Sequence, residues 1–556
     1  MSMKPHGLEP IPEETRRLVH RLSPKGTLVT QLRDALGPIY SDEQFAHLFP
    51  QRGRPAEAPW RLALVTVLQA IEGLTDRQAA AFVRTRIDWL YALALPLDDP
   101  GFDYSILTDF RQRLLAAQAQ DLMLEPILQL CRERGWLKAQ GKQCTDATAV
   151  LARVRALSSL ESAGEGMRAA LNALAEQDPD WLSAHLNPEW FERYVHRFEL
   201  ARFPKAETQR QLVRQQVGQD VAQLLAAVDQ PQTPQAVRVV GEVALLRQLF
   251  AQHYEQQGAQ VHWRDGPAVS NEHRLVSPYD PEARSSRKRD TVWLGYKVHL
   301  TETCDQDRGC PHLITHVETT VATLQDTEVL APIQEHLRAH DLAPAEHYVD
   351  QGYPSGPELV RQARLGTQII GPVGQQTSWQ EREHSGYAVC DFALDWHAQV
   401  ATCPQGHQSV GWTQPQDRHQ HPTVVIRFAT ATCRSCPVHA QCTRGQAGRT
   451  LTLTPPEVHA ALLERRALQR TPAFVQQYAL RAGVEGTISQ AVRTTRLRRT
   501  PYRGLRKTHL QHVAIAAGLS LKRIAVHLHA QSLGKPSRPA RSKSPFARLQ
   551  NQEEVA

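Results

Sequence analysis

HYVDQGY, residues 347–353, is a short run of strand-forming residues that ends on an acid and turns at a glycine. Aromatic and β-branched side chains favour a strand up to Asp350, and the glycine that follows favours a turn. Ligand sites of α/β sheets lie outside the carboxyl ends of the strands. The carboxylate of Asp350 is therefore expected at such an edge, and the segment indicates an α/β domain.

Strands and helices alternate on both sides of this segment. Upstream runs are dense in β-branched residues, and the segment between them and Asp350 has the spacing of an amphipathic helix. Strand runs followed by alternating helix and strand predict an α/β domain with a mixed sheet. The expected elements are strands at 141–150, 291–300 and 313–322, a helix at 326–340, a strand at 347–350, a helix at 357–364 and a strand at 367–373.

The N-terminal region reads as helices. Apolar residues at helical spacing precede Gly73, which can end a helix, and Thr75 with Gln78 forms a capping-box pattern for the next one. Two short helices joined by a tight turn fit a helix-turn-helix that reads DNA, and equally a plain helical bundle.

Changes in composition divide the chain into regions. The segment 155–260 is rich in Ala, Leu, Glu and Gln, whereas the later segment 374–455 breaks the strand–helix rhythm with cysteines. The expected divisions are a helical N-terminal domain at 1–125, the first part of the core at 138–373 with a helical insertion at about 155–260, a cysteine-rich insertion at 374–455, a C-terminal helical part of the core at 456–531, and a disordered basic tail at 532–556.

Length and composition fit a large protein of the cytosol. At 556 residues the chain exceeds the roughly 250–300 residues at which single cores stop growing, so more than one domain is expected. The apolar share of 41% is ordinary for a globular protein. No run nears the roughly 20 apolar residues that span a bilayer, and the N-terminus lacks a secretion signal.

The positive charge is concentrated rather than large. Lysine and arginine outnumber acids by 64 to 57, a net charge of +7, which alone is weak support for a polyanionic partner. A run without any acid is more informative, because clustered cations gain affinity for DNA by releasing condensed counterions. A solvated face is the alternative. The run consists of Arg493, Arg496, Arg498, Arg499, Arg503, Arg506 and Lys507.

Three acids stand in settings that suit metal-dependent cutting of DNA. Such chemistry uses two divalent ions about 3.5–4 Å apart, and magnesium prefers oxygen ligands, so a few converging carboxylates suffice. Asp146 lies in a strand-forming run, where an acid is costly to bury unless it is paired or binds metal. On one continuous helix, Tyr478, Arg481 and Glu485 would share a face. Each acid alone also fits a cap, a turn or an exposed ion pair.

Four closely spaced cysteines indicate a metal site rather than disulfides, because disulfides are rare in the cytosol. The pair Cys433 and Cys436 projects two thiolates from one tight turn, as tetrahedral zinc requires. Cys403 and Cys442 complete a set of four sulfur ligands, with His407 as an alternative nitrogen donor. Such a closed site would be structural. Free or buried cysteines are the alternative.

Together these motifs resemble those of the DDE transposases of bacterial insertion sequences, in the branch marked by Asp-x-Gly-Tyr and Tyr-x2-Arg-x3-Glu. The resemblance runs from about residue 30 to 530. One departure concerns the lysine that the family usually places seven residues after the glutamate: here that residue is Val492, with Arg493 and Arg496 as alternatives for its role. The matching stretches are Phe102–Arg111, Thr145–Thr148, Trp293–His299, Asp350–Tyr353, and Tyr478, Arg481 and Glu485.

The resemblance implies an RNase H-like mixed-sheet core in which Asp146, Asp350 and Glu485 bind two Mg²⁺ (or Mn²⁺) ions. Tyr478 and Arg481 would contact DNA phosphate or orient the glutamate. It also implies a zinc-bearing insertion, inverted-repeat and target DNA as partners, a homodimer in the synaptic complex, no membrane partner, and a bacterial cytoplasmic protein associated with the nucleoid. The other expected DNA contacts are Lys297, His299, Arg493, Arg496, Arg498 and Arg499.

Two other functions remain open from the sequence. The chain could be an RNase H-like nuclease or integrase that is not tied to its own element. It could also be a domesticated copy that binds DNA without cutting it, although the presence of all three acids weighs against this alternative.

Overall fold

The computed structural model describes residues 2–533 except 4, 6, 259, 267, 308, 376, 377, 384 and 419. From residue 534 on, the tail predicted to be disordered lies outside the described residues. The chain forms two compact units. The first unit comprises Met1–Lys138, Asp146–Leu324 and Val484–Ala556, and the second comprises Ala139–Thr145 and Gln325–Gly483.

The N-terminal part of the first unit is helical, as predicted. Helix α4 ends at Gly73, whose φ of 67° is left-handed, and Thr75 and Gln78 form the expected capping box of α5. Buried aromatic and aliphatic side chains fill the space between these helices. Their bounds are α1 Glu13–Leu22, α2 Leu28–Leu36, α3 Asp42–Phe45, α4 Pro59–Glu72, α5 Asp76–Thr85, α6 Ile87–Ala92, α7 Ser105–Ala116 and α8 Glu125–Glu133, with short 3-10 turns at Ala46–Leu48 and Gln120–Met123.

A sheet follows, in the strand order β4-β5-β1-β7-β8, with β6 also paired to β5. In the first unit, β5 is antiparallel to both β4 and β6. Gly295 has a φ of 151°, and a Cβ there would lie 2.1 Å from the carbonyl oxygen of Val150, so only glycine lets β5 approach the end of β1 so closely. The bounds are β1 Lys142–Leu151, β4 Arg284–Lys288, β5 Thr291–Thr303 and β6 Ile314–Val321.

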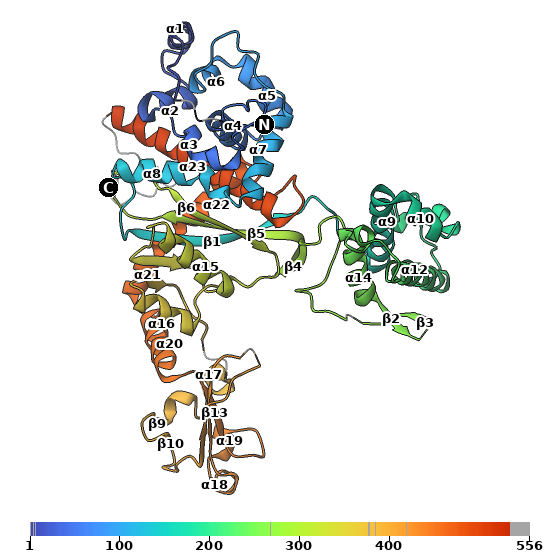
Figure 1. The fold of residues 1–556 in the computed structure, drawn as a ribbon. Coiled ribbons are helices and arrows are strands. Elements are labelled where there is room, and N and C mark those ends of the chain that lie inside the picture. Colours follow the sequence, from blue (N-terminus) through green and yellow to red (C-terminus); the bar gives the residue numbers. More distant parts are fainter. Residues whose placement is uncertain are drawn as a thin grey trace, which may run out of the picture. The chain divides into compact units, whose positions relative to one another are not determined.

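Two C-terminal helices complete this part of the first unit: α22 (Ala482–Thr494) and α23 (Leu505–Ser532). Helix α23 lies beside α2, α4 and β6 (Figure 1). It contains an 18-residue window with a mean hydropathy of 1.2, and by length and composition alone it is the one described helix that could cross a membrane. Since 67% of that window is buried in the protein, the hydrophobicity is accounted for by a core helix.

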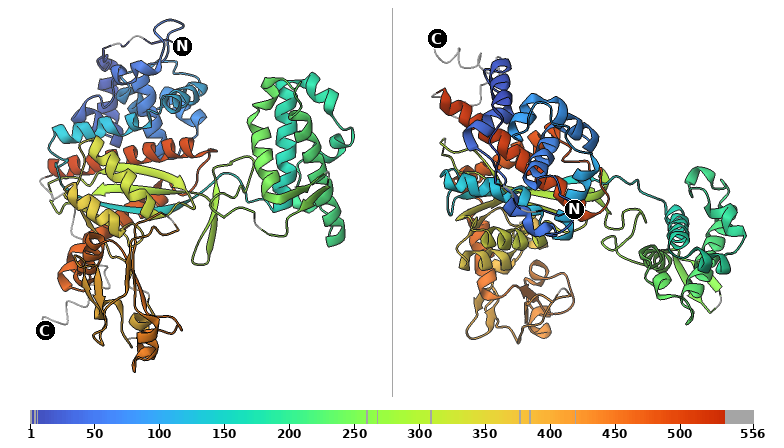
Figure 2. Two further views of the ribbon diagram at one scale, coloured as in Figure 1. Left: turned by 60° about the horizontal axis from the view of Figure 1, so that its bottom comes forward. Right: turned by 45° about the horizontal axis from the view of Figure 1, so that its top comes forward.

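The expected helical insertion consists of helices α9 to α14 and a hairpin. Helices α9, α12 and α14 lie side by side in the left view of Figure 2 and share a core that includes Trp190 and Tyr254. Within it, the buried carboxylate of Asp220 accepts hydrogen bonds from Arg193 and Tyr194. The bounds are α9 Ser159–Gln177, α10 Pro179–His185, α11 Glu189–Tyr194, α12 Glu207–Val228, α13 Gln235–Arg238, α14 Gly241–His253, β2 Tyr254–Gln257 and β3 Gln260–Trp263, with a 3-10 turn at Leu200–Arg202.

In the second unit, the first residues of β1 pair in parallel with β7, and β7 pairs in parallel with β8. These strands and the helices between them follow the predicted alternation, which makes the protein a mixed α/β fold with parallel and antiparallel strands. Figure 1 places α16 beside α20. The bounds are β7 Glu346–Val349, β8 Gln368–Ile370, α15 Asp326–Ala339, α16 Gly356–Arg364, α20 Pro456–Leu468 and α21 Pro472–Tyr478, with a 3-10 turn at Ala479–Arg481.

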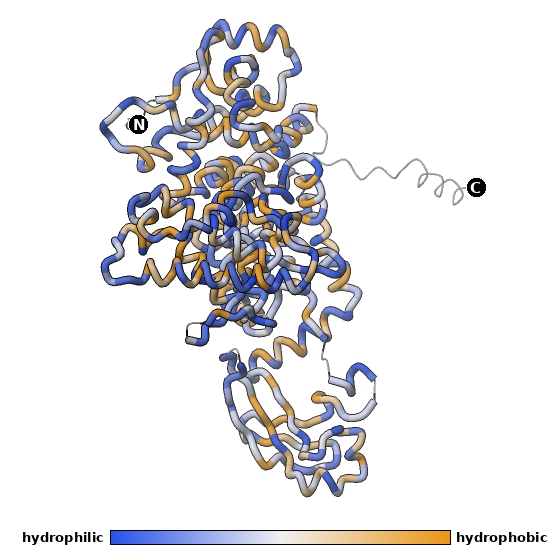
Figure 3. The backbone as a smooth tube through the Cα atoms, turned by 90° about the vertical axis from the view of Figure 1, so that its right-hand side faces the viewer, coloured by the Kyte–Doolittle hydropathy of each residue, from blue (hydrophilic) through white to orange (hydrophobic). Residues whose placement is uncertain are grey.

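The cysteine-rich segment of the second unit contains two small antiparallel sheets, β9-β10 and β11-β12-β13. Phe392, Ile426 and Phe428 are among the residues of its separate hydrophobic core. In the lower part of Figure 3, hydrophobic stretches run along these strands. The bounds are α17 Trp379–Glu383, β9 Ala393–Asp395, β10 Val400–Thr402, β11 Gly411–Thr413, β12 Val424–Arg427, α18 Thr430–Arg434, α19 His439–Cys442 and β13 Thr450–Leu453, with a 3-10 turn at Val389–Asp391.

Candidate active site

Asp350 lies directly after the last residue of β7, where the sequence predicted it. The backbone N–H of Gln351 donates to its Oδ1 at 2.8 Å, and its side chain is 50% exposed. An Nη2 of Arg481 lies 4.0 Å from Oδ2, which places one cation beside the carboxylate. The hydroxyl of Tyr478 donates to the carbonyl oxygen of Val349 at 3.2 Å. Tyr478 and Arg481 therefore pack on the end of the strand that displays Asp350.

Asp146 lies on β1, also as predicted. The N–H of Ala147 donates to its Oδ1 at 2.8 Å, and the side chain is partly buried. The residue before it, Thr145, is paired in register with Val349 of the parallel strand β7. Asp146 and Asp350 are thus the residues that directly follow the two members of the pair Thr145 and Val349.

The helix predicted through Tyr478, Arg481 and Glu485 is not one regular α-helix. Tyr478 ends α21, Arg481 ends a 3-10 turn, and Glu485 lies in the first turn of α22. Because a 3-10 turn has 3.0 residues per turn against 3.6 in an α-helix, the spacing rule of one regular α-helix does not apply across it. The boundary between the two units also falls between Arg481 and Glu485. Glu485 is exposed.

Helix α22 is held in the first unit by a buried polar group that the sequence did not reveal. The hydroxyl of Thr487 donates to the carboxylate of Glu302, which is 1% exposed. Arg523 also donates to Glu302 at 2.8 Å and to the hydroxyl of Thr487. These contacts join residues up to 221 positions apart, so no local pattern could have predicted them. They fix the helical turn next to Glu485.

The basic run lies beside the end of the strand that carries Asp146. The N–H of Leu151 donates to the carbonyl of Arg498 at 2.9 Å, and the N–H of Thr500 donates back to Leu151 at 3.1 Å. The guanidinium Nε of Arg498 also donates to the hydroxyl of Thr148 at 2.8 Å. All seven basic side chains of the run are exposed. The end of α22, the segment that connects it to α23 and the start of α23 therefore display a row of cations within the first unit.

Two of the residues expected to contact DNA lie on β5. His299 is completely buried, with its Nε2 3.3 Å from the hydroxyl of Thr320 on β6. A side chain without exposed surface cannot contact a phosphate, so its expected role is not supported. Lys297 is partly buried, and its ammonium group donates to the carbonyl of Leu324.

The four predicted zinc ligands lie together in the cysteine-rich segment. Cys403, Cys433, Cys436 and Cys442 all line one small cavity, together with His407 and His439. Burial raises the pKa of the Cys442 thiol, Arg449 lowers it, and the neighbouring cysteines raise it further. Among the described residues, no three of these sulfurs lie within 4.8 Å of one another. The donor set suits zinc, whereas its sulfurs are spaced more widely than in a closed tetrahedral site.

Comparison with known families gives two matches. Residues 402–525 match the family model described as Transposase DDE domain. Residues 17–113 match the one described as Transposase domain (DUF772). No curated protein and no solved structure gave a match. Glu485 lies inside the first matched range, and the α4–α5 pair lies inside the second, while Asp146 and Asp350 lie outside both.

Proposed function

Because this chain belongs to the DDE-type transposases of insertion sequences, we propose that it binds the terminal inverted repeats of its own element and cuts and rejoins DNA there. The catalytic groups in this proposal are Asp146, Asp350 and Glu485. The main observation in support of this proposal is the register of the parallel strands β1 and β7. Thr145 of β1 is paired with Val349 of β7, and the next residue of each segment is one of the two aspartates. A DDE domain implies an RNase H-like core, in which such a pair of strands carries the acids.

DDE transposase domains use divalent metals, generally Mg²⁺. The carboxylates fit such ions: Asp350 is half-exposed on a turn, and hard oxygen donors are the ligands that magnesium prefers. When bound, two ions would activate the attacking oxygen and stabilise the leaving oxygen of a phosphodiester. Arg481, 4.0 Å from Asp350, would neutralise that carboxylate before loading and contact DNA phosphate afterwards.

The exposed basic run would hold the DNA backbone beside Asp146. Arg498 donates a hydrogen bond to Thr148, which lies on β1 together with Asp146. This contact holds part of the run near the proposed catalytic acid. Phosphate contacts of this kind position DNA without reading its sequence. We assign the reading of the inverted repeats to the N-terminal helices. Helix α5 follows α4 after a tight turn, and its Arg77 and Arg84 are exposed.

Neutralising two arginines of the run should flatten the salt dependence of DNA binding. For Arg493→Gln with Arg499→Gln, the slope of log affinity against log salt is expected to fall by roughly two units, because about 0.9 counterion is released per phosphate contact. Both side chains are exposed, so folding should be unaffected. Fluorescence anisotropy over a salt series measures the slope. The double variant Arg493→Lys with Arg499→Lys keeps both charges and should retain the wild-type slope. An unchanged slope in the glutamine double variant would identify the run as a solvated face.

The cysteine cavity supports one structural zinc ion per chain. A closed four-thiolate site would join the end of β10 to the helices α18 and α19, neither of which has a buried residue. Its closure would draw the four sulfurs closer than they lie here. In this proposal the zinc stabilises the insertion and takes no part in cutting DNA.

Freshly purified protein should therefore contain about one zinc per chain. Cys436→Ser is expected to release it and to expose the segment 385–455 to limited proteolysis. Cys390→Ser is the matched control, because Cys390 is exposed and lies outside the four-thiol set. Metal analysis by mass spectrometry is the measurement. Protein purified without chelators that contains no zinc would contradict the assignment.

A supercoiled plasmid that carries the DNA flanking the gene tests the function as a whole. Cutting at the element's ends that requires Mg²⁺ or Mn²⁺ supports the transposase. Unspecific cutting would instead support a nuclease that is not tied to an element, and bound but intact DNA would support a domesticated copy. Synapsis of two ends requires two active sites, so we also propose a homodimer on DNA, acting in the bacterial cytoplasm at the nucleoid.

A further inference from the structure

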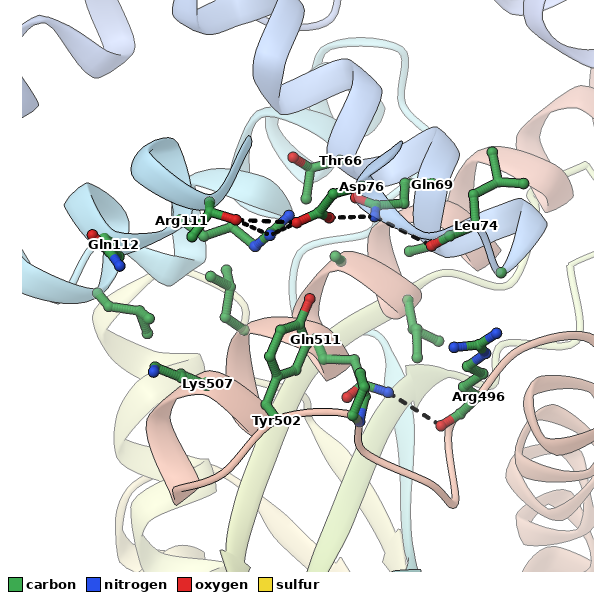
Figure 4. Close-up of a pocket in the computed structure, with 18 residues that line it drawn as sticks. Thr66, Gln69, Leu74, Asp76, Arg111, Gln112, Arg496, Tyr502, Lys507 and Gln511 are labelled. Carbon is green, nitrogen blue, oxygen red and sulfur yellow. Dashed lines mark hydrogen bonds and ion pairs between the residues drawn. The ribbon is translucent and has the colours of Figure 1, made fainter. Parts of the chain in front are cut away.

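A cavity of about 250 Å³ lies within the first unit, outside the catalytic groups proposed above. Its walls come from the end of α4, the start of α5, helix α7, the segment that connects α22 to α23, and the first turns of α23. Figure 4 shows Asp76 and Arg111 on one side of this space, with Tyr502, Gln511 and Lys507 on the other. The cavity therefore joins the helices assigned to reading DNA to the basic run.

The inside of the cavity suits a flat, largely apolar group. Tyr502 extends into the space between the two sides (Figure 4), and burial raises the pKa of its phenol, which keeps it neutral. The guanidinium carbon of Arg111 lies 5.9 Å from the centre of the Tyr502 ring. Apolar side chains complete the lining: Leu74, Leu115, Leu510 and Ile515.

Two buried polar atoms of the lining have no hydrogen-bond partner among the described residues: Nη1 of Arg111 and Oε1 of Gln511. The rest of each side chain is held in place. The other terminal nitrogen of Arg111 binds the carboxylate of Asp76, and Nε2 of Gln511 donates to the carbonyls of Arg496 and Arg499 at 3.2 and 3.1 Å. Buried polar groups are nearly always paired, so a donor and an acceptor left over in one cavity call for a ligand that pairs with both.

The mouth of the cavity is cationic. Arg496 and Lys507 line it, both are exposed, and both belong to the run that contains no acid. The one acid of the lining, Asp76, is already bound by Arg111, Gln69 and Thr108. A ligand with an anionic group outside and a flat group inside matches this distribution of charge.

We propose that this cavity binds a nucleotide. The base lies against Tyr502 and the apolar wall, its polar edge pairs with Arg111 and Gln511, and its phosphate meets Arg496 and Lys507. Base edges present donors and acceptors on a rigid ring, and aromatic side chains are the usual platform for unstacked bases. The nucleotide is either free or an unpaired residue of bound DNA. Only the second source depends on the proposed function.

Fluorescence of 2-aminopurine tests the proposal on the full-length protein without divalent metal. One probe is 2-aminopurine deoxyribonucleoside monophosphate, and the other is a short duplex with 2-aminopurine in a single-stranded overhang. Stacking on Tyr502 should quench the fluorescence. Ala70→Met, from a partly exposed position of α4, narrows the cavity and should weaken probe binding by roughly tenfold or more. Ala461→Met is the matched control, because Ala461 is also a partly exposed helical alanine and lies on α20, outside the lining and outside the helices assigned to reading DNA.

Saturable quenching of either probe that Ala70→Met reduces and Ala461→Met leaves unchanged supports the proposal. Quenching of the monophosphate identifies a free nucleotide as sufficient, and quenching of the overhang alone identifies DNA as the source. Absence of quenching with both probes, or quenching that Ala70→Met does not alter, would overturn it. Since neither probe is cut and no metal is present, a failure of the catalytic proposal would leave this result unchanged.

Discussion

Asp350→Asn is expected to leave binding of end DNA intact and to reduce DNA cleavage by at least about a thousandfold. Asparagine keeps the size of the side chain and can still accept from the N–H of Gln351, so the turn should persist. What is lost is the negative charge that holds a divalent ion. The contact with Arg481, at 4.0 Å on a half-exposed carboxylate, contributes at most about 1 kcal/mol to stability, so unfolding cannot account for a loss of this size.

The matched control for this variant is Asp341→Asn. Asp341 lies in the same unit, is exposed, and has a left-handed φ of 55° that asparagine also tolerates. Cleavage of the plasmid that carries the element's ends is the assay, and anisotropy with labelled end DNA measures binding. A variant that cuts within tenfold of the wild type would remove Asp350 from the catalytic set.

Glu485→Gln should produce a loss of similar size, again without loss of DNA binding. Glu485 is exposed in the first turn of α22, and the helix is anchored two residues later by Thr487, so the substitution should not disturb the fold. A carboxylate that holds a metal affects the chemical step, while affinity for DNA depends on phosphate contacts elsewhere. The rate constant for strand cleavage under Mg²⁺ is therefore the sensitive quantity.

Glu464→Gln serves as its control, because Glu464 is an exposed glutamate on α20. Near-normal cleavage by Glu485→Gln would mean that the third ligand lies elsewhere in the chain. Loss of DNA binding together with cleavage would instead indicate that Glu485 supports the protein's structure.

Local sequence patterns predicted much of the fold. Strand-forming residues and turn glycines located β1, β5, β6 and β7, and the capping pair Thr75 and Gln78 located the start of α5. Asp350 was placed correctly because a strand that stops at a turn leaves few positions for its last acid. These features depend on neighbours in the sequence, which is where periodicity and capping are informative.

Features that depend on distant contacts were not predicted. Spacing alone favoured one helix from Tyr478 to Glu485, but the chain tightens into a 3-10 turn while the Tyr478 hydroxyl binds the carbonyl of Val349, 129 positions away. His299 looked available from its motif, although cross-strand packing buries it. The cavity around Tyr502 and Arg111 is formed by segments that are far apart in the chain, so no local sequence motif predicted it.

Iron-directed cleavage of the protein itself tests the central claim, that three acids from separate segments bind the same metal ions. Fe²⁺ that replaces Mg²⁺ generates hydroxyl radicals with ascorbate and peroxide, and these cut the backbone close to the ion. The account predicts cuts near Asp146, Asp350 and Glu485 together, all suppressed by excess Mg²⁺ and all weakened by Asp350→Asn. Cuts confined to one of these segments, or cuts that Mg²⁺ does not suppress, would contradict it.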